Sequence, residues 1–197
     1  MRIFLWLAIL PSLVLAWRVL RHDRIEREPA GLLIRLFVMG MLTCIPAGIL
    51  EAVGDVAITV LDPGPALTSA LTYLVVVPGA EEVVKYLALR TTRKNRNFDY
   101  TFDGVVYGTM VGLGFATLEN ILYVLDSMTL EVALLRGIFS VPLHCVCGIY
   151  MGYYYGAAKG LDAQGLREQA SASRQMALAV PWAIHGLYDF EIGRAHV

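Results

Sequence analysis

The sequence predicts an all-α, polytopic membrane protein with about six transmembrane helices around a polar intramembrane site. Of its 197 residues, 57% are hydrophobic and only 17% are charged, whereas a soluble domain carries about a quarter charged residues. The apolar residues gather in runs of about 20, the length that crosses a bilayer as a helix. Short charged stretches separate these runs. The expected spans are residues 1–20, 31–53, 66–89, 103–125, 132–158 and 175–190.

The chain is expected to form one membrane domain over residues 1–190, because no gap between the apolar runs is long enough for a soluble domain. The last seven residues, EIGRAHV at 191–197, match the translation of a widely used sequencing adapter. We therefore expect this tail to be non-native. Histidine 196 is accordingly set aside as a ligand.

Lys and Arg residues predict the orientation of the helices. They are concentrated in the connections 21–30, 90–99 and 159–174, and the connections 55–65 and 126–131 contain none. Basic connections stay in the cytoplasm, so the N-terminus is expected outside a plasma membrane. Orientation alone accounts for these basic residues, and we expect no nucleic-acid partner.

Ionisable side chains inside the apolar runs are the main functional signal. Such a group at the bilayer centre costs about 2.5–3.5 kcal/mol on insertion scales, so it usually faces a protein interior or a watery cavity and has a function. Glu51 lies near the end of its run, where an interfacial position is open to it. The groups well inside the runs are Glu81, Glu82, Lys85, Glu119, His144, His185 and Asp189.

The segment PGAEEVVKYLAL places two carboxylates beside one amine. On a helix, Glu81 and Glu82 lie four and three residues before Lys85, so both reach its ammonium group. Two carboxylates that share one cation in a dry site differ in proton affinity, as acid–base chemistry requires. The structural alternative is a buried ion-pair cluster that only ties helices together.

Three later runs contribute further polar groups. Phe115 and Glu119 share one helical face, and Asn120 follows them. His185 and Asp189 are four residues apart, so the carboxylate can fix the tautomer of the imidazole. The remaining group is His144. The alternative to a functional role is that it is a core histidine whose hydrogen bonds serve only the fold.

Prolines precede three of these polar positions. Pro78 precedes Glu81, and Pro142 and Pro181 precede the two histidines. Proline removes a helical hydrogen bond and kinks a helix. Broken helices at membrane depth are tolerated where they line a cavity, so a wet, polar pocket is expected.

The ordered motifs resemble the PrsW family of bacterial membrane proteases, distant relatives of CAAX prenyl endopeptidases and Abi immunity proteins. The resemblance covers residues 78–190. It consists of E-E-x-x-K at 81–85, F-x-x-x-E-N at 115–120, and a single histidine in each of the next two runs. The CAAX-type relatives have histidine at the position of Glu119, which favours the PrsW family.

This resemblance implies hydrolysis of a peptide bond in a membrane-anchored protein, such as an anti-sigma factor. It implies a catalytic set of Glu81, Glu82, Glu119, His144 and His185, and we add Lys85, Asn120 and Asp189 as supporting residues. The favoured chemistry needs no cofactor: Glu81 or Glu82 takes a proton from water, and a histidine positions the water or stabilises the oxyanion. Alternatively, the same carboxylates and histidines bind zinc, which activates the water.

The sequence leaves two other functional classes open. A proton-coupled transporter also uses buried carboxylates and histidines in broken helices, although it would usually show inverted repeats. A membrane adaptor would use these groups only to hold helices together. Within the protease class, an Abi or CAAX-type role in immunity or prenyl-protein processing is the alternative.

Overall fold

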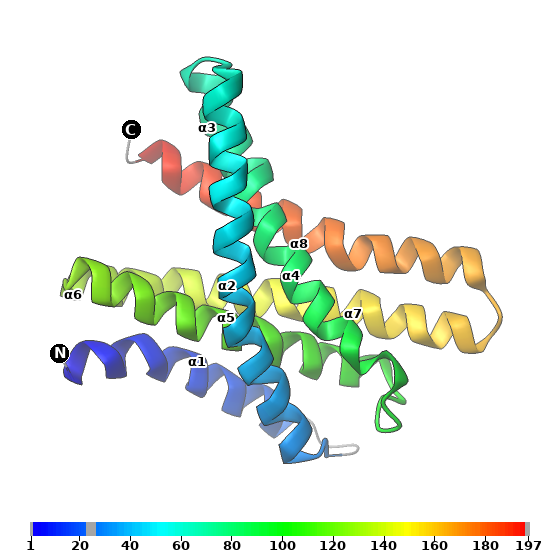
Figure 1. Ribbon diagram of the computed structural model, residues 1–197. Coiled ribbons are helices and arrows are strands. Elements are labelled where there is room, and N and C mark those ends of the chain that lie inside the picture. The colour runs from blue at the N-terminus through cyan, green and yellow to red at the C-terminus, as the bar shows by residue number, and fades with distance from the viewer. Residues whose placement is uncertain (1, 23–26, 196–197) are drawn as a thin grey trace.

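The computed structural model describes residues 2–22 and 27–195, so the last two residues of the expected adapter tail lie outside it. The described chain is helical almost throughout (Figure 1), which confirms the predicted all-α class. Its elements are α1 (Arg2–His22), α2 (Ala30–Leu61), α3 (Pro65–Leu71), η1 (Thr72–Val76), α4 (Val77–Arg90), η2 (Thr91–Lys94), α5 (Thr101–Ser127), α6 (Leu130–Leu135), η3 (Arg136–Ser140), α7 (Val141–Ala163) and α8 (Arg167–Ala195).

Within the described residues, five helical stretches are long and apolar enough to cross a membrane: Ile3–Arg21, Ala30–Leu61, Pro65–Lys94, Thr101–Ser127 and Leu130–Ala163. They correspond to the first five predicted runs, with the first stretch beginning at Ile3. The sixth, 175–190, is helical within α8. That helix is not among the five, because its polar N-terminal half and its embedded histidine and aspartate lower its hydropathy.

Helix α5 lies at the centre of the molecule and packs against α1, α2, α4 and α7 (Figure 1). Of its most apolar window, 72% is buried, compared with 17% for α1 and 22% for α2. The outer helices therefore turn most of their apolar surface toward lipid, as expected when the surrounding solvent is hydrocarbon.

Glycines allow α5 and α7 to approach closely, from the start of α5 to its middle. A Cβ atom at Gly108 would lie 2.9 Å from the Cα of Gly152, and one at Gly148 would lie 2.5 Å from the carbonyl oxygen of Gly108. No side chain fits in either place. This contact is the small-residue packing that membrane helices use.

Two spans change from α-helix to π-helix just before a proline. The π turn η1 precedes α4, whose second residue is Pro78, and the π turn η3 precedes α7, whose second residue is Pro142. Proline has no N–H to donate, so the ladder rearranges there, and such π turns often lie at functional sites. Pro181 differs, because α8 runs through it.

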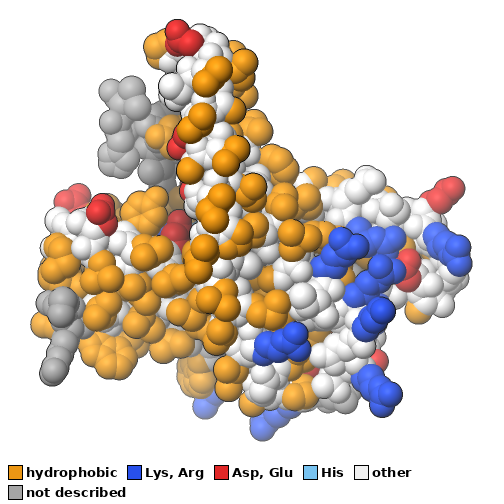
Figure 2. Space-filling model, viewed as in Figure 1, with side chains coloured by type: hydrophobic (Ala, Val, Ile, Leu, Met, Phe, Trp, Pro, Cys, Tyr) orange, Lys and Arg blue, Asp and Glu red, His pale blue; other side chains and the backbone are white. Residues whose placement is uncertain are grey.

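Lys and Arg side chains gather at one end of the face shown in Figure 2. This is the end where α7 is joined to α8 and where η2 leads into α5, whereas no blue side chain is visible around α3 and α6. The distribution follows the basic and non-basic connections of the sequence.

Candidate active site

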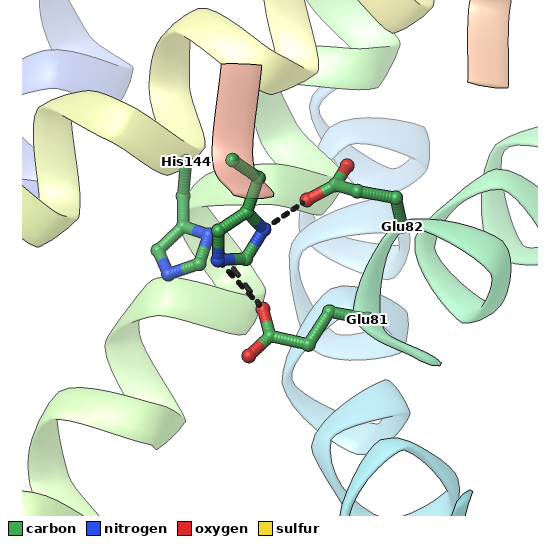
Figure 3. Close-up of side chains that lie close together, drawn as sticks. Glu81, Glu82 and His144 are labelled. Carbon is green, nitrogen blue, oxygen red and sulfur yellow. Dashed lines mark hydrogen bonds and ion pairs between the residues drawn. The ribbon is translucent and has the colours of Figure 1, made fainter. Parts of the chain in front are cut away.

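Three helices bring four of the predicted site residues together. Glu81 and Glu82 from α4 lie near His144 from α7 (Figure 3), and His185 from α8 completes the group. Their exposed fractions are 3%, 0%, 1% and 2%, respectively. One ligand atom from each lies within 4.8 Å of all the others. The expected convergence of polar groups from separate spans is therefore present in the structure.

Lys85 lies at the centre of this group. Its Nζ is 2.9 Å from Glu81 Oε2, 2.9 Å from Glu82 Oε1 and 3.0 Å from His144 Nδ1. An ammonium group has three N–H donors, so these three acceptors use all of them. The ring of Phe115 lies 3.9 Å from Nζ on a further side and adds a cation–π contact.

The contact with Lys85 defines the tautomer of His144. Because an ammonium only donates, His144 Nδ1 accepts, and the ring proton is on Nε2. Nε2 lies 2.9 Å from Glu119 Oε2, so it donates to that carboxylate. The F-x-x-x-E motif thus supplies an aromatic face for Lys85 and an acceptor for the histidine.

Arg136, in the π turn η3, joins the site although the sequence analysis did not select it. Its Nη2 lies 2.6 Å from Glu119 Oε2, and its Nε donates to Asn120 Oδ1 over 2.8 Å. Asn120 itself is fully buried and does not line the cavity, so it acts on the site through Arg136. The available signal was a basic residue inside an apolar run, at the end where the connections carry no Lys or Arg.

The second histidine is held mainly by a glutamate. His185 Nδ1 lies 2.9 Å from Glu82 Oε1, whereas its Nε2 is 3.3 Å from Asp189 Oδ2 and 3.8 Å from Glu81 Oε2. Asp189 Oδ2 makes no hydrogen bond among the described residues. The expected pair of His185 and Asp189 is therefore close in space, but Glu82 makes the better-aligned contact.

The two glutamates occupy different positions. Glu81 lines a cavity of about 930 Å³, whereas Glu82 lies behind it and is absent from the cavity wall. Glu82 Oε2 is buried without a hydrogen-bond partner in the described part of the chain. Glu81 is thus the carboxylate that a molecule in the cavity reaches first.

The cavity connects the polar cluster to the apolar part of the molecule. Its volume lies within the range of about 300–1,000 Å³ that is usual for ligand sites. Helices α2, α5, α7 and α8 contribute to its wall, together with the segment α6–η3. Its polar wall residues are Glu51, Tyr73, Glu81, Glu119, Tyr123, Arg136, Ser140, His144, His185, Tyr188 and Asp189, and its apolar ones include Ala47, Phe115, Leu135, Phe139 and Leu143.

The donor types of the cluster suit a divalent metal ion. Carboxylate and imidazole are ordinary zinc ligands, and four of them meet here. Glu119, which the sequence placed among the potential ligands, lies outside this group of four. The Lys85 ammonium already contacts three members, so a metal ion between them would require Lys85 to withdraw.

Comparisons with known proteins agree with the motifs. A family profile described as "PrsW family intramembrane metalloprotease" matches residues 28–196. The proteins named Protease PrsW of Bacillus subtilis (strain 168) and Oceanobacillus iheyensis are 32% and 31% identical, and each alignment covers 92% of this chain and 79% of the relative. That of Geobacillus kaustophilus is 32% identical over 92% of this chain and 76% of the relative. No solved structure matches the chain.

Helices long enough to cross a bilayer and matches over most of the chain together lead to one assignment. The protein is a multi-pass membrane peptidase and belongs to the PrsW family of intramembrane proteases.

Proposed function

We propose that the cluster of Glu81, Glu82, His144 and His185 is the catalytic site, and that it hydrolyses a peptide bond of a membrane-anchored protein held in the cavity. The observation that carries this proposal is the convergence of four buried acid–base side chains, three of which line a substrate-sized cavity. Buried titratable groups at a cavity are the usual mark of a catalytic site.

In the proposed reaction, Glu81 is the general base. It takes one proton from a water molecule, whose oxygen attacks the carbonyl carbon of the scissile bond. The carbon–nitrogen bond then breaks, and Glu81 returns the proton to the leaving nitrogen. Glu81 fits this role because it faces the cavity, whereas Glu82 is occupied with Lys85 and His185.

The histidines have separate roles in this proposal. Both nitrogens of His144 already have partners, so this ring positions Lys85 and Glu119. His185 donates from Nδ1 to Glu82, which leaves its Nε2 on the side of Glu81. Nε2 can then accept the second proton of the water in a hydrogen bond and orient the water for attack.

A metal ion is the alternative source of activation. Glu81, Glu82, His144 and His185 would hold it, and the description of the matching family as a metalloprotease supports this version. When bound, such an ion supplies a Lewis acid that polarises a carbonyl group and makes a bound water more acidic. Lys85 supports the metal-free version, because it already neutralises the paired carboxylates.

The orientation and the substrate are also part of the proposal. The basic connections favour a cytoplasmic location for η2 and the α7–α8 turn in a bacterial cell, with the N-terminus outside the plasma membrane. The cavity then opens in the outer half of the bilayer. The family resemblance supports a single-span membrane protein as substrate, and an anti-sigma factor is the substrate that we propose.

Co-expression with tagged single-span membrane proteins tests the proposal. We expect the unchanged protein to convert full-length substrate into a shorter tagged fragment, and Glu81→Ala and Glu82→Ala to leave it intact. Glu131→Ala is the control, since Glu131 is an exposed carboxylate on α6. Cleavage by the Glu81 and Glu82 variants at the rate of the control would refute the proposed site.

A further inference from the structure

Glu51 lines the same cavity as the catalytic cluster. It lies on α2, within a stretch that is apolar enough to cross the membrane, and it is half-buried. The reaction proposed above gives Glu51 no role.

Glu51 differs from the other carboxylates of the cavity wall. Four acidic residues line the cavity, and three lie close to a Lys, Arg or His side chain of the chain itself. For Glu51, the described residues provide no hydrogen bond and no ion pair within reach. The three pairs are Glu81 with Lys85 at 2.9 Å, Glu119 with Arg136 at 2.6 Å, and Asp189 with His185 at 3.3 Å.

A carboxylate without a partner at membrane depth is costly, and such a group marks a functional site by default. The surroundings favour a cation as its partner. Asp55, one helical turn further along α2, is exposed, and the connections at this end of the molecule contain no Lys or Arg. Glu51 therefore has no cation of the described chain as its partner, so a positively charged group of a bound peptide can pair with it, whereas a negatively charged group is repelled.

We propose that Glu51 is a substrate-binding residue that selects a Lys or Arg side chain of the peptide held in the cavity. This proposal rests on the proposed peptidase function, because it specifies the substrate of the same site. The long aliphatic stem of a basic side chain suits the apolar wall, which includes Ala47 and Phe139, while its charged end reaches the carboxylate.

Peptide binding to the detergent-purified full-length protein tests this inference. The probes are three fluorescent peptides with one shared apolar sequence and either Lys, norleucine or Glu at the central position. We expect the unchanged protein to bind the Lys peptide about ten-fold more tightly than the norleucine peptide, and the Glu peptide most weakly. Glu51→Gln should remove most of this preference, and Glu51→Lys should shift it toward the Glu peptide.

Asp55→Asn is the matched control, because it removes a carboxylate from the same helix outside the cavity wall. It should keep the Lys preference. Glu51→Gln is nearly isosteric, and its melting temperature shows whether it folds. Equal affinities for the three peptides, no binding of any peptide, or the same preference in Glu51→Gln and the unchanged protein would overturn the inference.

Cleavage of the co-expressed single-span proteins is measured separately. If cleavage depends on Glu81 but not on the charge of the substrate, the proposed function stands and the proposed role of Glu51 is wrong. If the Lys preference depends on Glu51 but no cleavage depends on Glu81, the proposed role of Glu51 stands and the proposed reaction is wrong. The two failures are thus distinguishable.

Discussion

The contact between α5 and α7 has two halves with opposite character. Toward the end where α7 is joined to α8, glycines bring the two backbones so close that no side chain fits between them. Toward the other end, Glu119 of α5 is hydrogen-bonded to His144 of α7, and the cavity is lined there by Phe115, Glu119 and residues of the π turn η3. One half is dry and rigid, and the other has room for a substrate.

The boundary between the halves lies at Gly112, where a Cβ atom would be 2.5 Å from the carbonyl oxygen of His144. The backbone that carries the histidine is therefore fixed by the tight half, whereas its ring faces the open half. A site that must hold reacting groups within fractions of an ångström benefits from such a rigid neighbour. The comparison predicts that substitutions in the cavity change activity, and that substitutions in the glycine contact change stability.

The largest effect is expected for Glu81→Gln. The amide cannot accept a proton from water, and general base catalysis contributes about 10²–10⁴-fold to rates. We expect the cleavage rate to fall by about 10³-fold, and the melting temperature shows whether the variant still folds. Immunoblots of the tagged substrate over time measure the rate, with Glu131→Gln as the exposed control. A variant that retains a tenth of the activity or more would show that Glu81 is not the base.

A smaller loss of activity is expected at Arg136, which holds Glu119 in position against His144. Removing a group that orients a site residue typically costs about 10–100-fold. Arg136→Gln should lose activity in this range, and Arg136→Lys should recover part of it because the ion pair with Glu119 can still form. Melting temperatures of both variants separate this role from a structural one. Equal losses in the Gln and Lys variants, matched by equal losses of stability, would assign Arg136 to the fold alone.

Substitutions in the glycine contact between α5 and α7 should lower the stability of the protein. A Cβ atom at Gly152 would overlap the backbone of α5 at Gly104, and forced overpacking costs about 1–3 kcal/mol. Gly152→Ala should therefore lower the thermal unfolding midpoint in detergent. Gly160→Ala on the same helix is the control, since nothing lies within 4 Å of its added methyl group. Equal midpoints for the two variants would contradict the close contact.

Much of this arrangement follows from the sequence because lipid imposes simple requirements. Helix class and the first five spans come from apolar length, and the polar cluster comes from ionisable groups that lipid does not tolerate. The adapter-like tail at 191–197 stays a prediction, as does the orientation of the helices in the bilayer.

The partnerships within the site were less accessible from the sequence. Spacing along one helix pairs His185 with Asp189, but packing between α4 and α8 gives the histidine Glu82 as its closer partner. Arg136 and Glu51 join the cavity because of how η3 and α2 lie across from α5. Contacts between helices depend on tertiary packing, which the periodicity of one helix does not contain.

The smallest effect is expected from removing metal ions. This experiment tests whether Lys85 or a metal ion neutralises the carboxylates of the catalytic cluster. Lys85 directs all three of its N–H groups into the cluster, so the paired carboxylates already have a cation. We therefore expect dialysis of the purified protein against EDTA or 1,10-phenanthroline to change the cleavage rate by less than about two-fold, within the variation that exposed changes produce. Elemental analysis of the dialysed protein checks that metal has left.

A large loss of activity that zinc restores would instead mean that Lys85 withdraws and that the four side chains hold an ion. In that case, Lys85→Met should bind zinc more tightly than the unchanged protein, because it removes the competing ammonium and leaves the carboxylates without a cation.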